Sequence, residues 1–206
     1  IGITGTPVVD PTANILYVYT MTKENGRQYA HQLHALDIKT GSEKPCTPIT
    51  IQASVSGTGD GTSGGKVSFK ASVENQRSAL LLSNGIVYIS WASFSDTGLY
   101  HGWLIGYAYN GRVFHQVTRG VYNVTPNGQA GGIWMSGAGP AADNNGNIYL
   151  ITGNGTFDLD AGGPDAGDSF IKLNTKKGLS LSDYFTPFNQ SCLSAGDKDL
   201  GSVGPL

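Results

Sequence analysis

The chain has 206 residues and a formal net charge of −2, and only 14% of its residues are charged. Lysine and arginine are scattered and form no basic stretch, which argues against nucleic acid as a partner. No apolar run approaches the roughly 20 residues that a membrane-spanning helix needs, so we expect no membrane span. The many glycines and tyrosines and the short apolar runs indicate an all-β protein without helices.

Three copies of one strand pattern follow each other along the chain. In each copy a short first strand, a tight turn and a second strand containing a tyrosine precede a third strand. The first copy comprises Pro7–Asp10, Ile15–Tyr19 and Leu33–Gly41; the second comprises Ala79–Ser83, Val87–Ser90 and Leu104–Gly111; the third comprises Ser136–Ala142, Ile148–Thr152 and Ser169–Leu173. Tyr17, Tyr88 and Tyr149 occupy equivalent positions in this alignment, so the pattern repeats.

We interpret each copy as one four-stranded antiparallel blade of a β-propeller. The blades span about residues 1–65, 66–125 and 126–190, and a further blade starts at 191–206. The spacing of the copies exceeds the ~40 to 50 residues of a plain blade, so we expect long inserted loops, at 57–65 and 158–168. A propeller closes with at least about four blades. We therefore expect a fragment of a larger propeller, whose partners are the remaining blades or another copy.

One segment of the first copy resembles a known repeat. Ala35-Leu-Asp37-Ile-Lys-Thr40-Gly41 is similar to the motif that closes the blades of the quinoprotein alcohol dehydrogenase-like superfamily, the PQQ-like repeat. That motif ends with Trp four residues later, where this chain has Pro45. Weaker versions end the other two copies. The resemblance extends over nearly the whole chain and implies a propeller of that superfamily.

The resemblance also implies a cofactor site. Gly131-Gly-Ile-Trp134 resembles the segment whose Trp supports pyrroloquinoline quinone (PQQ) in members that oxidise alcohols or sugars. Gly153-Asn154 resembles the turn whose Asn oxygen coordinates calcium. Asp197-Lys-Asp199-Leu200 resembles the segment bearing the base that takes the substrate's hydroxyl proton. Trp134, Asn154 and Asp197 are thus the implied cofactor, metal and catalytic residues.

The chain also departs from the pattern of those enzymes. Gly155, Thr156 and Phe157 stand where the superfamily usually has Pro and Trp. No adjacent pair of cysteines is present, and no acidic calcium ligand can be placed in an earlier copy. The alternative for Trp134 is that it fills space within a blade and binds no cofactor. These departures favour a relative that has kept the fold and lost the cofactor.

Three Asn-X-Ser/Thr glycosylation sequons, at Asn123, Asn154 and Asn189, favour a secreted, extracellular glycoprotein. An asparagine that carries a glycan cannot also bind a buried ion, so the two interpretations of Asn154 exclude each other. The only cysteines, Cys46 and Cys192, could pair with each other, remain as free buried thiols, or pair with a segment outside this chain, because spacing alone does not decide it.

Three further groups of residues are weaker candidates. The acidic loop with Asp158, Asp160, Asp165 and Asp168 could hold calcium, but a solvated turn is the preferred interpretation. His31 and His34 lie on one strand three residues apart, so they point to opposite faces and a zinc site is not expected. Tyr100-His101-Gly102-Trp103 could stack a carbohydrate at a loop rim or serve as ordinary packing.

The functional hypothesis is a secreted propeller module that acts as a binding or structural scaffold, with an eroded quinoprotein site; its ligand could be a glycan or a protein. The alternative is a PQQ- and calcium-dependent alcohol or sugar dehydrogenase. The absence of any cofactor is as compatible with the sequence as PQQ and calcium are.

Overall fold

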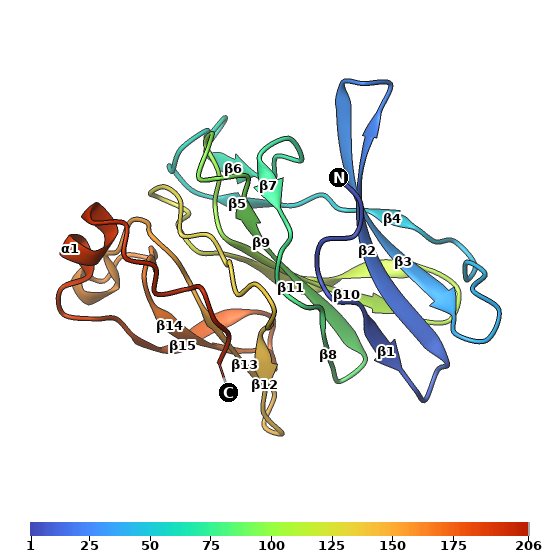
Figure 1. Ribbon diagram of the computed structural model, residues 1–206. Helices are drawn as coiled ribbons and strands as arrows, with labels where there is room; N and C mark the ends of the chain where they lie inside the picture. Colours follow the sequence, from blue (N-terminus) through green and yellow to red (C-terminus); the bar gives the residue numbers. More distant parts are fainter. Residues whose placement is uncertain (206) are drawn as a thin grey trace.

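The computed structural model describes residues 1–205 as three antiparallel sheets and one small ribbon (Figure 1). Sheet I contains β1 (Val8–Asp10), β2 (Ile15–Glu24), β3 (Gln28–Asp37) and β4 (Ile49–Thr50). Sheet II contains β7 (Glu74–Asn75), β8 (Leu81–Ser83), β9 (Ile86–Ser93), β10 (Trp103–Tyr109) and β11 (Phe114–Asn123). Sheet III contains β12 (Ala141–Ala142), β13 (Asn147–Ile151), β14 (Phe170–Asn174) and β15 (Ser180–Phe185). The ribbon pairs β5 (Ser54–Ser56) with β6 (Lys66–Ser68). The all-β prediction is confirmed.

The three tyrosines of the repeat occupy equivalent places in the three sheets. Tyr17 in β2 pairs with both β1 and β3. Tyr88 in β9 pairs with β8 and β10, and Tyr149 in β13 pairs with β12 and β14. The second strand of each copy therefore lies between the first and the third, as an antiparallel meander requires.

The sheets pack face to face, with sheet II in the middle. Successive side chains of a strand point to opposite faces. Ile89 and Ile105 of sheet II therefore pack with sheet I, whereas Tyr88 and Leu104 pack with Ile148 and its neighbours in sheet III. Both faces of sheet II are thus buried, which explains why β9 and β10 read as nearly continuous apolar runs.

Four short segments, residues 4–7, 77–80, 135–139 and 201–205, are joined to one another by backbone hydrogen bonds, and we call them the inner segments. The backbone N–H of Leu80 donates to Thr6 O at 3.0 Å, and that of Ala79 donates to Ala138 O at 2.7 Å. Met135 N donates in turn to Gly201 O at 3.0 Å. Each inner segment is therefore hydrogen-bonded to the next one along the chain, and residues 201–205 lie against residues 135–139 in the same way.

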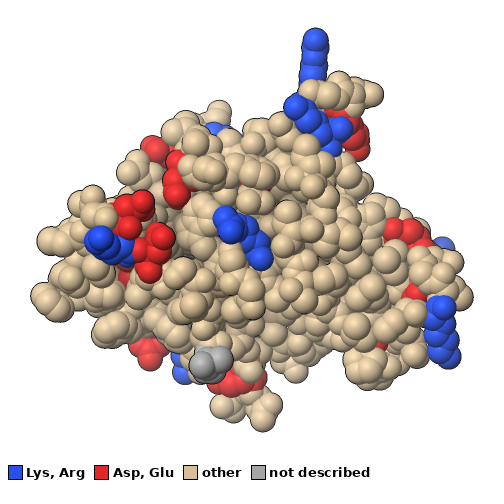
Figure 2. Space-filling model, viewed as in Figure 1, with Lys and Arg blue, Asp and Glu red and all other residues tan. Residues whose placement is uncertain are grey.

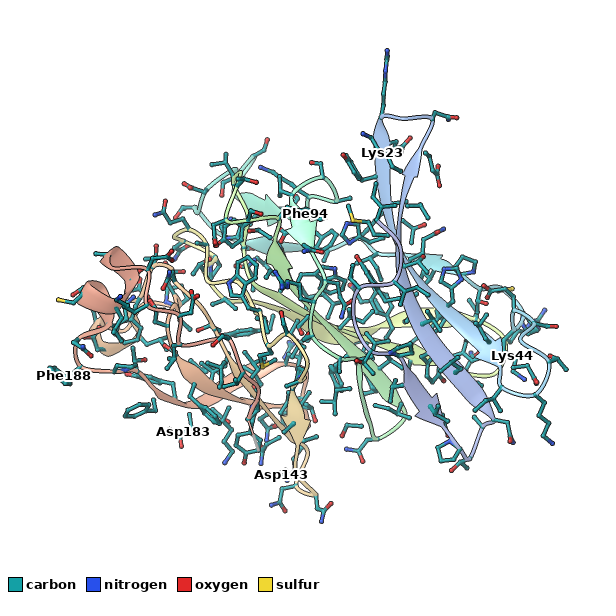
Figure 3. The ribbon with its side chains drawn as sticks, viewed as in Figure 1. Lys23, Lys44, Phe94, Asp143, Asp183 and Phe188 are labelled. Carbon is teal, nitrogen blue, oxygen red and sulfur yellow. The ribbon has the colours of Figure 1, made fainter. Side chains whose placement is uncertain are left out.

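Two hairpins extend beyond the sheets. The β2–β3 hairpin continues to the pair Glu24 and Gln28, well past the predicted end of its second strand, and Lys23 lies close to its tip (Figure 3). The β12–β13 hairpin places Asp143 at the lower edge of the molecule in the same view. The predicted loops at 57–65 and 158–168 are present as the β5–β6 connection and the β13–β14 connection.

Two sequence-based predictions of secondary structure were wrong. The chain has a short helix, α1 (Gln190–Ala195), and a 3₁₀ turn at Leu159–Ala161, although no helix was expected. A six-residue helix is too short to produce a readable period. The strand predicted at Ser136–Ala142 is reduced to β12, because Gly137 has a φ of +79° and Pro140 cannot donate to a ladder.

No helix among residues 1–205 has the length and apolar character needed to cross a membrane.

Candidate functional site

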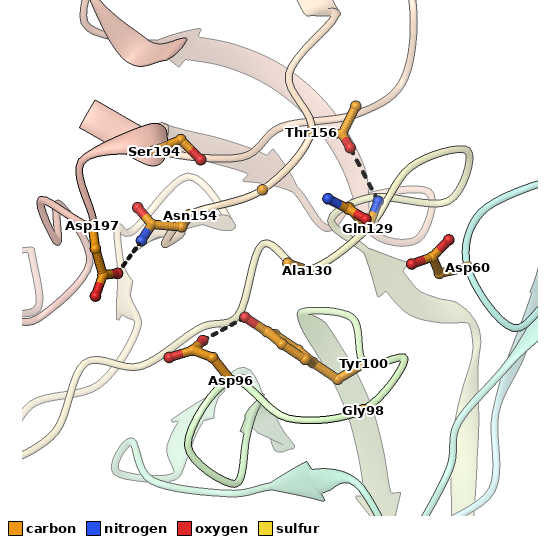
Figure 4. Close-up of a pocket in the computed structure, with 11 residues that line it drawn as sticks. Asp60, Asp96, Gly98, Tyr100, Gln129, Ala130, Asn154, Thr156, Ser194 and Asp197 are labelled. Carbon is orange, nitrogen blue, oxygen red and sulfur yellow. Dashed lines mark hydrogen bonds between the residues drawn. The ribbon is translucent and has the colours of Figure 1, made fainter. Parts of the chain in front are cut away.

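A depression of about 460 Å³ lies where the loops of sheets II and III meet α1. We call it the site depression (Figure 4). It is lined mainly by polar side chains and by one aromatic ring: Asp60, Asp96, Tyr100, Gln129, Asn154, Thr156, Ser194 and Asp197. Two of the three residues that the resemblance implied, Asn154 and Asp197, are among them.

Asn154 and Asp197 are directly hydrogen-bonded. Asn154 Nδ2 donates to Asp197 Oδ1 at 2.7 Å, although the residues come from the end of sheet III and from the turn after α1 (Figure 4). This bond fixes the orientation of the amide, because only its nitrogen can donate to a carboxylate. Asn154 Oδ1 therefore faces the other way, and it is buried without any hydrogen-bond donor.

Trp134 lies beside this pair and lines an adjoining pocket of about 390 Å³ with Arg77 and Asp199. A Cβ placed on Gly153, the residue before Asn154, would lie 2.7 Å from Trp134 Cδ1, so only glycine fits there. Tyr100 meets the Trp134 ring edge-on at 6.4 Å, and the Arg77 guanidinium lies over the ring at 5.6 Å from its centroid. Trp134 therefore lies against the chain neighbour of Asn154, in a pocket that shares Asp96 with the site depression.

The site depression is acidic. Asp60, Asp96 and Asp197 line it without a lysine or arginine among the lining residues. Asp96 accepts a hydrogen bond from the Tyr100 hydroxyl at 2.6 Å, and burial together with this carboxylate raises the pKa of Tyr100. Figure 2 shows acidic atoms gathered on the side of this face where α1 lies. Among residues 1–205, no group of three or more His, Cys, Asp or Glu is arranged to hold a metal ion.

The acidic loop of the β13–β14 connection is not the solvated turn that the sequence favoured. Asp165 and Asp168 are buried, and Asp165 Oδ1 accepts from Asn127 N at 2.9 Å. Asp158 Oδ1 accepts from Asp165 N at 2.7 Å, while Asp160 is exposed. Most of these carboxylates therefore hold the loop together instead of gathering around one ion.

The two cysteines are free and exposed, so the disulfide considered from the sequence is not formed. Cys46 lies in the β3–β4 connection and Cys192 in α1, at opposite ends of the molecule (Figure 1). Two cysteines that far apart cannot be bridged.

The three sequons differ in their surroundings. Asn123 is 5% exposed, and its Oδ1 accepts from the N–H of Thr125, the fully buried third residue of its own sequon. The Asn154 side chain lies in the site depression, where its Nδ2 donates a hydrogen bond to Asp197. Asn189 precedes α1, is half-buried and makes no side-chain hydrogen bond that caps the helix. Asn189 is therefore the sequon whose side chain is least constrained.

The remaining candidates are structural. His31 is fully buried and His34 is partly exposed, on opposite faces of β3 as predicted. His101 and Trp103 pack in the interior, whereas Tyr100, although only 5% exposed, also lines the site depression.

Sequence reasoning missed Glu74, which is 1% exposed in β7. Its Oε1 accepts from Trp103 Nε1, and its Oε2 has no donor. A single glutamate beside an apolar pattern carries no signal that would have identified it.

Comparison of the chain with protein-family models, with curated proteins and with solved structures finds no significant match.

Proposed function

We propose that the chain is part of a β-propeller with PQQ-like repeats, in which sheets I, II and III are blades and residues 191–205 begin a fourth. The face-to-face packing of the sheets and the hydrogen bonds between successive inner segments support this. The remaining blades of the same protein, or another copy, are the partners that such an arrangement needs. The three sequons support a secreted, extracellular location.

For the site depression we propose a binding function toward a small ligand rich in hydroxyl groups, of the carbohydrate class. The observation that carries this proposal is the hydrogen-bonded pair of Asn154 and Asp197, set in a polar depression bordered by Tyr100 and Trp134. Carboxylates accept hydrogen bonds from hydroxyl groups, and aromatic rings pack against the apolar faces of sugar rings. A few convergent polar groups beside aromatic surface are typical of small-molecule sites.

A quinone-dependent alcohol or sugar dehydrogenase is the second candidate, and the unpaired amide oxygen of Asn154 favours it. A buried oxygen without a donor suits a cation, which calcium would supply. When bound, the quinone would provide a hydride acceptor. Of the chain's own groups, Trp134 would support a flat ring, and the Asp197 carboxylate would accept a hydroxyl proton.

The test uses the full-length protein and saccharides, with iodide quenching of tryptophan fluorescence as the readout. Among residues 1–205, Trp91 and Trp103 are fully buried, so Trp134 supplies the quenchable signal of this part of the protein, and Trp134→Phe identifies its share. A bound sugar should reduce quenching in the parent protein. Asp197→Asn and Asn154→Ala should weaken this effect at least about tenfold, the loss of a charged hydrogen bond. Asn189→Gln, outside the depression, is the matched control. No protection by any saccharide would refute the carbohydrate proposal.

The dehydrogenase is tested by incubating the same protein with PQQ and calcium. A retained quinone absorbance after gel filtration, with dye reduction by alcohols or aldoses, is the expected result for the second candidate. Asp197→Asn should then keep the chromophore and lose dye reduction, because it removes only the base. A protein that keeps no chromophore is not a quinoprotein.

A further inference from the structure

Large aromatic side chains are exposed where β15 leads into α1. Phe188 is fully exposed, Phe185 is 66% exposed and Tyr184 is 39% exposed. Figure 3 shows Phe188 at the outer end of the molecule, on the side that carries α1. Among residues 1–205, no large apolar side chain is more exposed than Phe188. Adjacent exposed aromatic side chains of this kind indicate a surface that something covers.

A pocket of about 380 Å³, which we call the outer pocket, lies beside this aromatic surface. Its aromatic walls are Phe157, Tyr184 and Phe188, and the rings of Phe157 and Tyr184 meet edge-on with their centroids 6.2 Å apart. The other lining residues are mainly polar: Asp160, Thr186, Pro187, Gln190 and Ser191. Aromatic rings beside polar groups suit a sugar, because a sugar ring has apolar faces and carries hydroxyl groups on its edge.

Two polar groups of the outer pocket are hydrogen-bond acceptors. Gln190 Nε2 donates to Asp168 Oδ2 at 3.0 Å and to Gly155 O at 3.1 Å. Both of its hydrogens are therefore used, and its Oε1 is left as an acceptor. The exposed Asp160 carboxylate forms no ion pair within residues 1–205, and it too can only accept. A ligand with hydroxyl and amide N–H donors therefore matches the outer pocket.

The sequon of Asn189 is embedded in the lining of the outer pocket. Phe188 precedes Asn189, and Gln190 and Ser191 follow it. Gln190 N donates to Pro187 O at 2.9 Å, which closes a β-turn with Phe188 and Asn189 as its central residues. The φ of −104° and ψ of 27° at Asn189 are near those of the second central residue of a type I turn. Ser191, the third residue of the sequon, is exposed.

We propose that the outer pocket binds the first N-acetylglucosamine of a glycan on Asn189, with the sugar ring packed against Phe188. In the modification, Asn189 Nδ2 forms a bond to C1 of the sugar, the bond from C1 to the pyrophosphate of a lipid-linked oligosaccharide breaks, and Nδ2 loses one proton. The acetamido N–H and the hydroxyl groups then donate to Asp160 and Gln190 Oε1. The inference rests on the proposed secreted location, and no residue lines both the outer pocket and the site depression.

The experiment measures the thermal transition of the full-length protein secreted from a eukaryotic host, with glycan occupancy checked by mass. The parent protein should melt at least about 2 °C higher than Asn189→Gln, because the sugar covers apolar surface. In the Phe188→Ser background, Asn189→Gln should no longer lower the transition. Phe185→Ser is the matched control, because Phe185 is exposed but does not line the outer pocket, and this variant should keep the effect of the glycan.

A second measurement needs no substitution. In NMR spectra of the glycosylated parent protein, protons of the first N-acetylglucosamine should be shifted upfield by the ring current of an aromatic side chain. The reference is the same sugar on the denatured protein, in which no ring is held against it.

Three outcomes overturn the inference and leave the proposed ligand site intact. Additive effects of Asn189→Gln and Phe188→Ser on the transition would show that sugar and ring do not interact. Unshifted sugar protons would show the same, even if Phe188→Ser fails to fold. A glycosylated protein whose Asn189 is unmodified would exclude this pocket as a glycan site. A protein without a glycan at any sequon would in addition count against the secreted location, whereas saccharide protection of Trp134 depends on none of these results.

Discussion

Trp103 Nε1 donates a hydrogen bond to Glu74 Oε1 at 3.2 Å in the interior of sheet II. The indole is fully buried, and Glu74 is almost as inaccessible. A carboxylate in such surroundings is costly in its charged form, so burial raises the pKa of Glu74 well above its usual value, although the His101 amide and the Trp103 indole act against it.

The first prediction is that the buried Glu74 makes the free energy of unfolding decrease as pH rises. Because the pKa is higher in the folded than in the unfolded protein, the folded state holds the proton more tightly above pH 4.5, and stability is lost as pH rises. Glu74→Gln should remove this loss, so the variant should gain stability relative to the parent by up to about 1.4 kcal/mol per pH unit. Urea unfolding at several pH values between 5 and 8 measures the difference. A difference that stays constant with pH would contradict the role of Glu74.

The second prediction is that the buried His31 causes a loss of stability at acidic pH. Its Nε2 donates to Ala71 O at 2.9 Å, so Nδ1 is the acceptor for the Trp91 indole at 3.2 Å. Burial lowers the pKa of His31 to about 4, and stability should therefore be lost as pH falls from about 6.5 to 4, by roughly 3 kcal/mol in all. His31→Gln should be less stable than the parent at pH 7, and this difference in stability should shrink by roughly 3 kcal/mol as pH falls across that range. The comparison of acid unfolding curves decides this, and parallel curves would refute it.

The third prediction is that Asn189 carries the glycan of the folded protein when it is made in a eukaryotic secretory pathway. A glycan on Asn123 would require the burial of its sequon to be undone, and one on Asn154 would fill the site depression. Asn189→Gln should therefore remove the mass added by glycosylation, whereas Asn123→Gln should leave it. A sugar found on Asn154 by peptide mass spectrometry would rule out Asn154 as a ligand for either sugar or cation.

The fourth prediction is that both thiols react in the native protein. Cys46 and Cys192 are exposed and unpaired, so a thiol reagent should modify two groups per chain without denaturant. Cys46→Ser and Cys192→Ser should each reduce this number by one and leave the thermal transition unchanged. Reaction of only one group would indicate that the other is covered by a partner.

The sequence predicted the sheet pattern because local chemistry carries it. Asn84-Gly85 has a positive φ at both residues and Asn145-Gly146 has one at its glycine, and each turn is followed by an apolar strand with its tyrosine. The β2–β3 hairpin ends at Asn25-Gly26, the same signal, but the strands beside it are polar and exposed. Without an apolar alternation, the extension of these strands was not predictable.

The candidate site was predicted only where a short segment of the sequence resembled a known motif. Trp134, Asn154 and Asp197 were singled out by a resemblance; in the structure Asn154 is hydrogen-bonded to Asp197, and Trp134 lies against Gly153. Asp168 and Glu74 were not distinguished from ordinary acidic residues, because what sets them apart is burial. Asp168 is buried because α1 covers it, and Glu74 is buried because sheet II encloses it. Neither of these contacts is between neighbours in the chain.

The inner segments tie neighbouring sheets to each other through backbone hydrogen bonds. The N–H of Leu80 is satisfied by Thr6, and that of Ala79 by Ala138, so the two amides are held by residues far apart in the chain. Contacts of this kind slow folding, because long loops must close before any bond forms. Amide hydrogen exchange at these positions would follow the parting of whole sheets and not the fraying of any one strand. The lifetime of two backbone protons would thus report whether neighbouring sheets separate one at a time or together.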